Sequence, residues 1–150
     1  MTLTIHQGDP RDPAATRLLQ ASHALMKDLF PSESCHFLDI DDLCAPEIAF
    51  FVVKDGAATI GCGALSTQPG YGELKSMFVD PAARGKGAAN LLLTHLIELA
   101  RSKNLPLLRL ETGEKLTAAI NLYQRHGFTR RPPFGTYPDH PDSTFMERPL

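Results

Sequence analysis

A glycine-rich turn that follows a predicted strand and opens a predicted helix is the clearest chemical signal in the sequence. Glycine lets the backbone approach a ligand closely, and the first turn of a helix presents free N–H groups at the positive end of the helix dipole. Phosphate groups bind at such a place. The predicted phosphate-binding residues, two of them cationic, are Arg84, Gly85, Lys86, Gly87, Ala88 and Ala89.

Several interpretations of this turn remain open. A P-loop requires the pattern GxxxxGK(S/T), and no such string occurs in the sequence. A dinucleotide-binding turn requires GxGxxG, whereas Asn90 stands where the third glycine would fall. Glu111, at the end of the next predicted strand, is the one feature that favours a dinucleotide site. The same residues also fit a helix start that binds no ligand.

The elements around this turn are predicted from hydrophobic periodicity and from turn and cap signals. The predicted strands cover residues 3–7, 48–53, 57–65, 73–79, 107–111, 128–130 and 144–147. The predicted helices cover residues 13–30, 87–103 and 117–125, with a short helical patch at 39–43. This order predicts an α+β fold with a mixed central sheet of about seven strands flanked by about four helices.

The order of these elements also predicts how the strands pair. The three strands between residues 48 and 79 are joined by short turns, which favours an antiparallel meander. The strand–helix–strand unit between residues 73 and 111 requires a parallel pair with a right-handed crossover. The glycine-rich turn is expected at the start of that crossover.

The composition is that of an ordinary globular chain. Its 150 residues, 43% of them hydrophobic, predict a single domain over residues 1–150 whose core needs no disulfide or metal. A net charge of −2 without a basic face or tail argues against a nucleic-acid partner. With no signal peptide and no apolar run of the ~20 residues that span a bilayer, we expect a cytoplasmic protein without a membrane partner.

The cysteines and histidines follow no disulfide or metal-binding pattern. Cys35, Cys44 and Cys62 lack CxxC spacing, and their odd number favours a reducing compartment. The six histidines share no ligand spacing with one another or with the cysteines. We therefore predict no metal site.

The segment from residue 72 to residue 128 resembles the core of the GNAT superfamily of acetyltransferases. The residues that carry the resemblance, in family order and spacing, are Val79-x-Pro81, the turn from Arg84 to Ala89, and Leu122-Tyr123-x-x-x-Gly127-Phe128. The turn satisfies the diphosphate pattern (Q/R)xxGx(G/A) of that family. Segments 31–36, 61–65, 73–77, 111–113 and 132–134 look like a bacterial subgroup typified by YsnE-like acetyltransferases.

This resemblance implies an N-acetyltransferase that uses acetyl-CoA and acts on the amine of a small molecule or amino acid by direct attack in a ternary complex. It implies a GNAT fold whose fourth and fifth strands splay apart at a β-bulge. The pantetheine arm would lie in that gap beside the backbone of Met77, Phe78 and Val79, with the Phe78 N–H bonded to the thioester oxygen. Glu73 matches the position of the general base and Tyr123 that of the general acid.

The resemblance and the loop positions also suggest residues for the acceptor pocket. Lys75 is expected to bind an acidic group of the substrate or to pair with a neighbouring carboxylate. His36 is a second candidate for the base. The complete set of predicted acceptor residues is Ser34, His36, Lys75, Glu111 and Tyr137.

One position departs from the family pattern. Many GNAT proteins carry Asn seven residues before the tyrosine of the last helix, where Leu116 stands here. The departure supports an alternative function as a non-catalytic CoA-binding sensor or regulatory module. A dinucleotide-binding oxidoreductase is a weaker alternative. The family also makes a homodimer through an edge strand an expectation.

Overall fold

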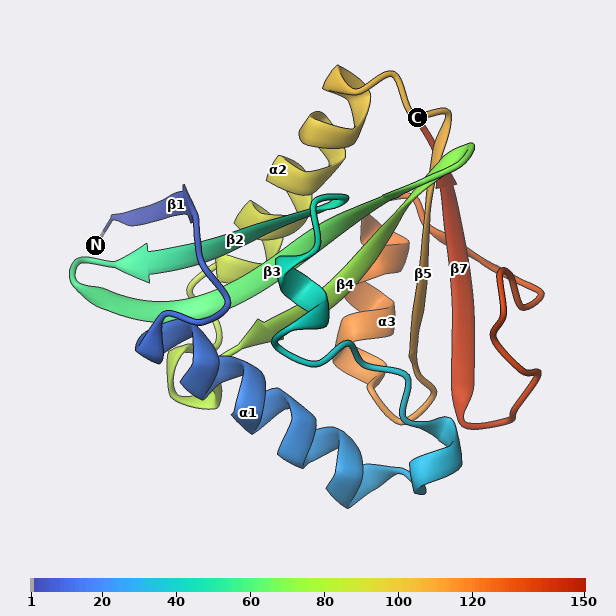
Figure 1. Ribbon diagram of the computed structural model, residues 1–150, viewed down its shortest axis with the longest axis horizontal. Helices are drawn as coiled ribbons and strands as arrows, with labels where there is room; N and C mark the ends of the chain where they lie inside the picture. Colours follow the sequence, from blue (N-terminus) through green and yellow to red (C-terminus); the bar gives the residue numbers. More distant parts are fainter. Residues whose placement is uncertain (1) are drawn as a thin grey trace.

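The computed structural model describes residues 2–150 as a twisted seven-stranded sheet with helices on both faces (Figure 1). The strand order across the sheet is β1-β2-β3-β4-β5-β7-β6. The strands are β1 (Leu3–Gln7), β2 (Ile48–Asp55), β3 (Ala58–Gln68), β4 (Tyr71–Val79), β5 (Leu107–Gly113), β6 (Thr129–Arg131) and β7 (Ser143–Pro149). The α-helices are α1 (Pro13–Leu29), α2 (Ala88–Ser102) and α3 (Thr117–Arg125).

The predicted strand pairing is confirmed. Strands β2, β3 and β4 form the antiparallel meander, and β4 pairs with β5 in parallel. Three short 3-10 helices supplement the α-helices: η1 (Ser32–Ser34), η2 (Asp42–Cys44) and η3 (Pro81–Ala83). The α+β class and the seven strands therefore agree with the sequence prediction.

The short helical patch predicted at residues 39–43 forms only the 3-10 helix η2. The carboxylate of Asp39 accepts a hydrogen bond from the Asp42 N–H at 2.9 Å, and the Asp42 carboxylate accepts one from the Asp39 N–H at 3.3 Å. These side chains offer the backbone an alternative to α-helical hydrogen bonds. Residues 2–150 accordingly contain three α-helices, where about four helices were expected.

The sheet separates two apolar layers because alternate residues of a strand point to opposite faces. Phe50 and Val52 of β2 pack with α1 on one face. Phe51 and Val53 pack with α2 on the other face, where the core continues to α3. The same alternation on β4 places Leu74 in the core under α2, so Glu73 and Lys75 face the α1 side.

The parallel pairing of β4 with β5 is short. Only two residue pairs join the strands, Gly72 with Leu108 and Glu73 with Arg109. Beyond Glu73 the strands diverge, and Figure 1 shows them close at one end and apart at the other. The predicted splay between the fourth and fifth strands is therefore present.

A β-bulge in β4 accompanies this divergence. On β3 the pairing passes from Cys62 to Ala64 over one residue, whereas β4 passes from Phe78 to Lys75 over two. Ser76 is one of these two residues and adopts a φ of +56°. An extra residue bends its strand and increases its twist, so the bulge turns the end of β4 away from β5.

The bulge generates a stability prediction. Replacing Ser76 by glycine should raise the free energy of unfolding by about 1 kcal/mol, because glycine tolerates positive φ and removes a buried hydroxyl that has no hydrogen-bond partner. The melting temperature should rise by about 2–4 °C. Ser76→Val should instead lower it, because a β-branched side chain tolerates this backbone least. A glycine variant that melts below the unmodified protein would contradict the strained bulge.

Candidate active site

The predicted phosphate-binding turn forms the N-terminus of α2. Gly85 and Gly87 have φ angles of 82° and 89°, and Gly87 is the N-cap of the helix. The first backbone hydrogen bond of the helix runs from the Leu91 N–H to the Gly87 carbonyl, at 3.0 Å. The N–H groups of Ala88 and Ala89 consequently have no partner inside the helix and are available to an anion.

A cleft of about 650 Å³ adjoins this turn, and we call it the α2 cleft. Its walls are the end of β4, the first turn of α2 and the exposed side of α3. Arg84 of the turn, Leu116 and Tyr123 line it. The cleft therefore connects the anion-binding helix end to the side chains of α3.

The end of β4 offers this cleft a free backbone edge. Phe78 and Val79 pair with β3 on one side, through Cys62 and Gly61. On the other side β5 has already diverged, so the polar backbone groups of β4 there have no strand partner. An extended ligand with amide groups can pair with such an edge.

Tyr123 lies in α3 at the wall of the α2 cleft. Its side chain is buried, and its ring packs against Phe128 with centroids 5.8 Å apart. Burial raises the pKa of the Tyr123 phenol, and the negative charge of Glu111 adds to this rise. The hydroxyl is therefore protonated at neutral pH and can give a proton to an anion that forms in the cleft.

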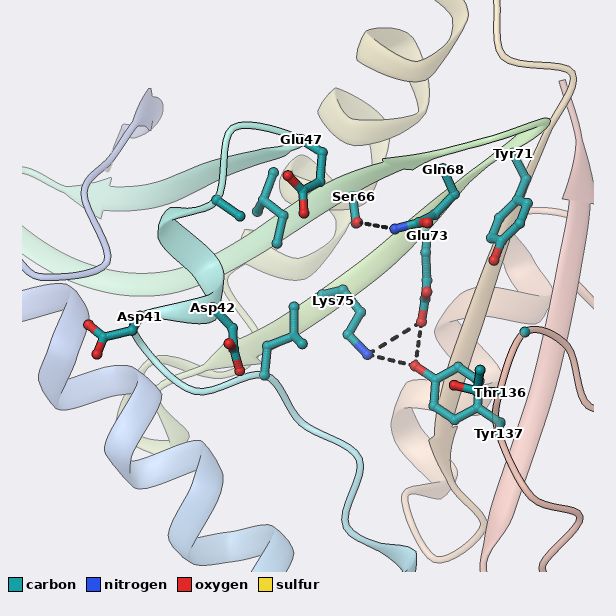
Figure 2. A pocket seen from close by; sticks show the side chains of 14 residues that line it. Asp41, Asp42, Glu47, Ser66, Gln68, Tyr71, Glu73, Lys75, Thr136 and Tyr137 are labelled. Carbon is teal, nitrogen blue, oxygen red and sulfur yellow. Dashed lines mark hydrogen bonds and ion pairs between the residues drawn. The ribbon is translucent and has the colours of Figure 1, made fainter.

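A second cavity, of about 620 Å³, lies against the first half of β4, and we call it the β4 pocket. Its walls come from segment 38–48, the β3–β4 hairpin and the loop 135–137 (Figure 2). Glu73, Lys75 and Tyr137 lie together on one side of it. The two cavities therefore meet different parts of the same strand.

These three side chains form one hydrogen-bonded cluster. The Tyr137 hydroxyl donates to Glu73 Oε2 at 2.5 Å. Lys75 Nζ donates to the Tyr137 hydroxyl at 2.7 Å and lies 3.3 Å from Glu73 Oε2. Burial raises the pKa of the Tyr137 phenol, and the Glu73 charge raises it further, so Tyr137 stays a donor.

The ammonium group of Lys75 has no donor left for a ligand. A lysine ammonium carries three N–H donors. Those of Lys75 are directed to Glu73, to Tyr137 and to the carbonyl oxygen of His36, the last at 3.3 Å. Of the two roles considered for Lys75, the structure shows the pairing with a neighbouring carboxylate.

The other predicted acceptor residues lie beside the cluster. The His36 ring meets Tyr137 edge-on at 5.4 Å, and its Nε2 atom is buried without a partner. Burial lowers the pKa of His36, and the Lys75 charge lowers it further. Burial raises the pKa of Glu111, which stands two residues beyond the last residue of β5 that pairs with β4. His36 and Glu111 adjoin the β4 pocket without lining it.

Ser34 makes its hydrogen bonds to residues outside this cluster. Its buried hydroxyl lies 3.1 Å from the Pro31 carbonyl and 3.2 Å from Asp142 Oδ2. These contacts tie η1 to the segment before β7. The acceptor role expected for Ser34 therefore stays a prediction without a contact that supports it.

The sequence analysis did not select the carboxylates on the other side of the β4 pocket. Asp41, Asp42 and Glu47 line it there (Figure 2), and Asp41 also forms an ion pair with Arg11 at 2.9 Å. The acidic composition of segment 39–47 is the sequence signal that could have identified them. Lys75 is the cationic side chain among the described residues that line this pocket, and the three N–H donors of its ammonium group are already used.

Three further observations concern metal ligands, membrane-spanning helices and cysteines. Within residues 2–150, no three His, Cys, Asp or Glu side chains gather closely enough to hold a metal ion. None of the helices described for this chain has the length and apolar character needed to cross a membrane. Cys35, Cys44 and Cys62 are free thiols.

Comparisons with known proteins give a consistent result. The model of the acetyltransferase (GNAT) family matches residues 15–128. An IAA acetyltransferase of Azospirillum brasilense is 41% identical over 150 residues, which cover 99% of this chain and 98% of the relative. The uncharacterized N-acetyltransferase YsnE of Bacillus subtilis is 38% identical over 123 residues, covering 80% of this chain and 82% of the relative.

Solved structures agree with these relatives. A crystal structure of a Klebsiella pneumoniae protein named as an acyl-CoA N-acyltransferase has a TM-score of 0.83 at 33% identity, and covers 99% of this chain and 98% of its own. The PaiA N-acetyltransferase of Thermoplasma acidophilum, in complex with coenzyme A, has a TM-score of 0.76 at 15% identity over the full length of both chains. The second likeness concerns the fold alone.

Leu116 generates a prediction for this site. It is the N-cap of α3 and has no side chain that can accept a hydrogen bond from the free N–H groups of the helix. Leu116→Asn should raise the free energy of unfolding by about 1 kcal/mol relative to Leu116→Ala, which removes the same apolar contacts without adding a cap. Thermal melts of the two variants measure this difference. Equal melting temperatures would show that α3 gains nothing from a cap.

Proposed function

Because the chain belongs to the acetyltransferase (GNAT) family, a family of acyltransferases, we propose that it transfers an acetyl group from acetyl-CoA to the amine of a small molecule in a ternary complex. The relatives confirm both the family resemblance and its YsnE-like subgroup. The observation that carries the proposal is the gap between β4 and β5, which has an anion-binding helix end on one side and a buried carboxylate on the other.

The α2 cleft fits the co-substrate. The turn from Arg84 to Ala89 would hold the diphosphate with its free N–H groups and with the Arg84 guanidinium. The Lys86 ammonium of the same turn pairs with Asp55 at 3.2 Å. The open edge of Met77, Phe78 and Val79 would pair with the amide groups of the pantetheine arm. These roles rest mainly on backbone groups, which the structure leaves unpaired.

Acetyl-CoA supplies an activated acetyl thioester when it is bound. A backbone N–H of the open edge of β4 would bond the thioester oxygen and stabilise the negative charge that develops there. Glu73 would take the proton of the attacking amine, directly or through water, as the new C–N bond forms. The Tyr123 hydroxyl would give its proton to the sulfur as the C–S bond breaks.

Two further expectations belong to this proposal. Free thiols at Cys35, Cys44 and Cys62 fit a reducing cytoplasmic compartment, where we place the reaction. Strands β1 and β6 are the edge strands through which a homodimer would form. The homodimer stays a prediction.

Tyr123→Phe tests the proposed reaction. The variant keeps the ring packed against Phe128 but has no proton to donate, so the acetyl-transfer rate should fall about a hundredfold. Calorimetric titration should give the same affinity for acetyl-CoA as the unmodified protein, which separates catalysis from binding. An unchanged rate would remove Tyr123 from the mechanism.

The same titration separates the alternative functions. Saturable binding of acetyl-CoA, without acetylation of any amine in a broad panel, would favour the non-catalytic sensor. Binding of NAD instead of acetyl-CoA would favour the dinucleotide-binding oxidoreductase. Acetyl-CoA-dependent release of free thiol that requires an amine would establish the transferase.

The charge of the β4 pocket predicts which acceptors react. Carboxylates of Asp42 and Glu47 line the pocket, and the Lys75 ammonium is already saturated. Among the described residues that line the pocket, the carboxylate of an amino acid would therefore meet like charges and no free cation. We expect n-butylamine to react with a kcat/KM about tenfold higher than that of 4-aminobutyrate. Both compounds are primary amines on a short unbranched chain, and 4-aminobutyrate differs by the carboxylate at its other end. A preference for 4-aminobutyrate would contradict this assignment.

A further inference from the structure

We propose that Tyr137 is a positioning residue that fixes the Glu73 carboxylate, so that one carboxylate oxygen is held and the other is left to accept the proton of the amine. This inference rests on the proposed function of the site. Tyr137 lies in the loop between β6 and β7, and it would act on the proton transfer that Glu73 of β4 carries out.

The hydrogen bonds of Glu73 are confined to one of its two oxygens. Oε2 accepts from the Tyr137 hydroxyl at 2.5 Å and lies 3.3 Å from Lys75 Nζ (Figure 2). No hydrogen bond within residues 2–150 involves Oε1, and Glu73 lines the β4 pocket although its residue is only 8% exposed. Oε1 is thus the oxygen available to an acceptor amine or to a water that serves it.

The position of Tyr137 is itself determined by its surroundings. Its loop turns tightly, with the Tyr137 N–H donating to the Phe134 carbonyl at 3.2 Å and with Gly135 at a φ of +59°. The Tyr137 ring packs against the rings of Phe134 and Phe145, with centroids 5.2 and 5.6 Å away. The hydroxyl therefore reaches Glu73 from a side chain whose ring is held on several sides.

Tyr137 also joins the two charged members of the cluster. Its hydroxyl accepts from Lys75 Nζ at 2.7 Å while it donates to Glu73. It can do both because a phenol has one donor and can accept as well. Without this hydroxyl, Lys75 and Glu73 would keep only their direct contact of 3.3 Å, and the carboxylate would be free to rotate.

Other charged groups surround Glu73 and have to be considered for its protonation. From β4 itself comes Lys75, and from the loop after α1 comes the His36 ring, which lies edge-on to Tyr137. From β5 come Glu111 and Arg109, and Arg109 is engaged by Glu147 at 2.8 Å. The phenol of Tyr137 is the only neutral donor to Glu73 in the described hydrogen bonds, and it can be removed without changing any charge.

Tyr137→Phe provides the test because it removes the hydroxyl and keeps the ring. Without the hydroxyl the Glu73 carboxylate is free to rotate, so Oε1 would be directed at the acceptor amine less often. We expect kcat to fall about tenfold with an unchanged KM for acetyl-CoA.

Two further variants make the test specific. Pro138→Ala changes the exposed neighbour of Tyr137 in the same loop, and it should leave the rate unchanged. In a Glu73→Gln background, Tyr137→Phe should have no additional effect on the rate, because the group it positions is already absent. Independent, multiplicative losses in the double variant would overturn the proposal.

A measurement without turnover separates this inference from the proposed function. The carbon-13 shift of the Glu73 side-chain carboxyl at neutral pH reports the hydrogen bonds that this group accepts. We expect this shift to differ between Tyr137→Phe and the unmodified protein, and to be the same in Pro138→Ala as in the unmodified protein. An unchanged shift in Tyr137→Phe would overturn the positioning role even if amines are acetylated. A changed shift in a protein that acetylates no amine would support the positioning role and reject the proposed function.

Discussion

The β-bulge at Ser76 is the constraint on which the arrangement of the site depends. An extra residue in β4 interrupts its pairing with β3, and the strand leaves β5 after two paired residues. A regular β4 would continue to pair with β5 and would close the gap. Because of the bulge, the end of β4 lacks hydrogen bonds to β5 and has an open backbone edge. Ser76 itself adopts a left-handed conformation that Ser rarely occupies.

The divergence of β4 from β5 also separates the part of β4 that offers backbone groups from the part that offers side chains. Its last residues offer backbone groups to the α2 cleft, whereas Glu73 and Lys75 offer side chains to the β4 pocket. Both of these side chains are largely buried, so their charges must be compensated locally. Tyr137 and the His36 carbonyl complete that compensation, which is why segments remote in sequence converge on this strand.

Local patterns in the sequence predicted the parts of the site that are built from contiguous residues. The turn from Arg84 to Ala89 could be recognised because its glycines and the following helix are adjacent in the chain. The hydrogen bond between Glu73 and Tyr137 could not be recognised from a local pattern, because 64 residues separate the partners and only the folded sheet brings them together. The family resemblance implied a β-bulge between the fourth and fifth strands, but its position at Ser76 could not be predicted, because Ser carries no preference for positive φ.

The departure at Leu116 fits this division between backbone and side-chain recognition. It lines the α2 cleft, where the open edge of β4 and the N-terminus of α2 supply the polar contacts through main-chain atoms. Loss of one polar side chain there removes one contact and leaves the others in place. In the β4 pocket the polar contacts join side chains of β4 and of the loop 135–137 with the backbone carbonyl of His36, and each group is engaged with another. Substitution in that pocket therefore alters several interactions at once.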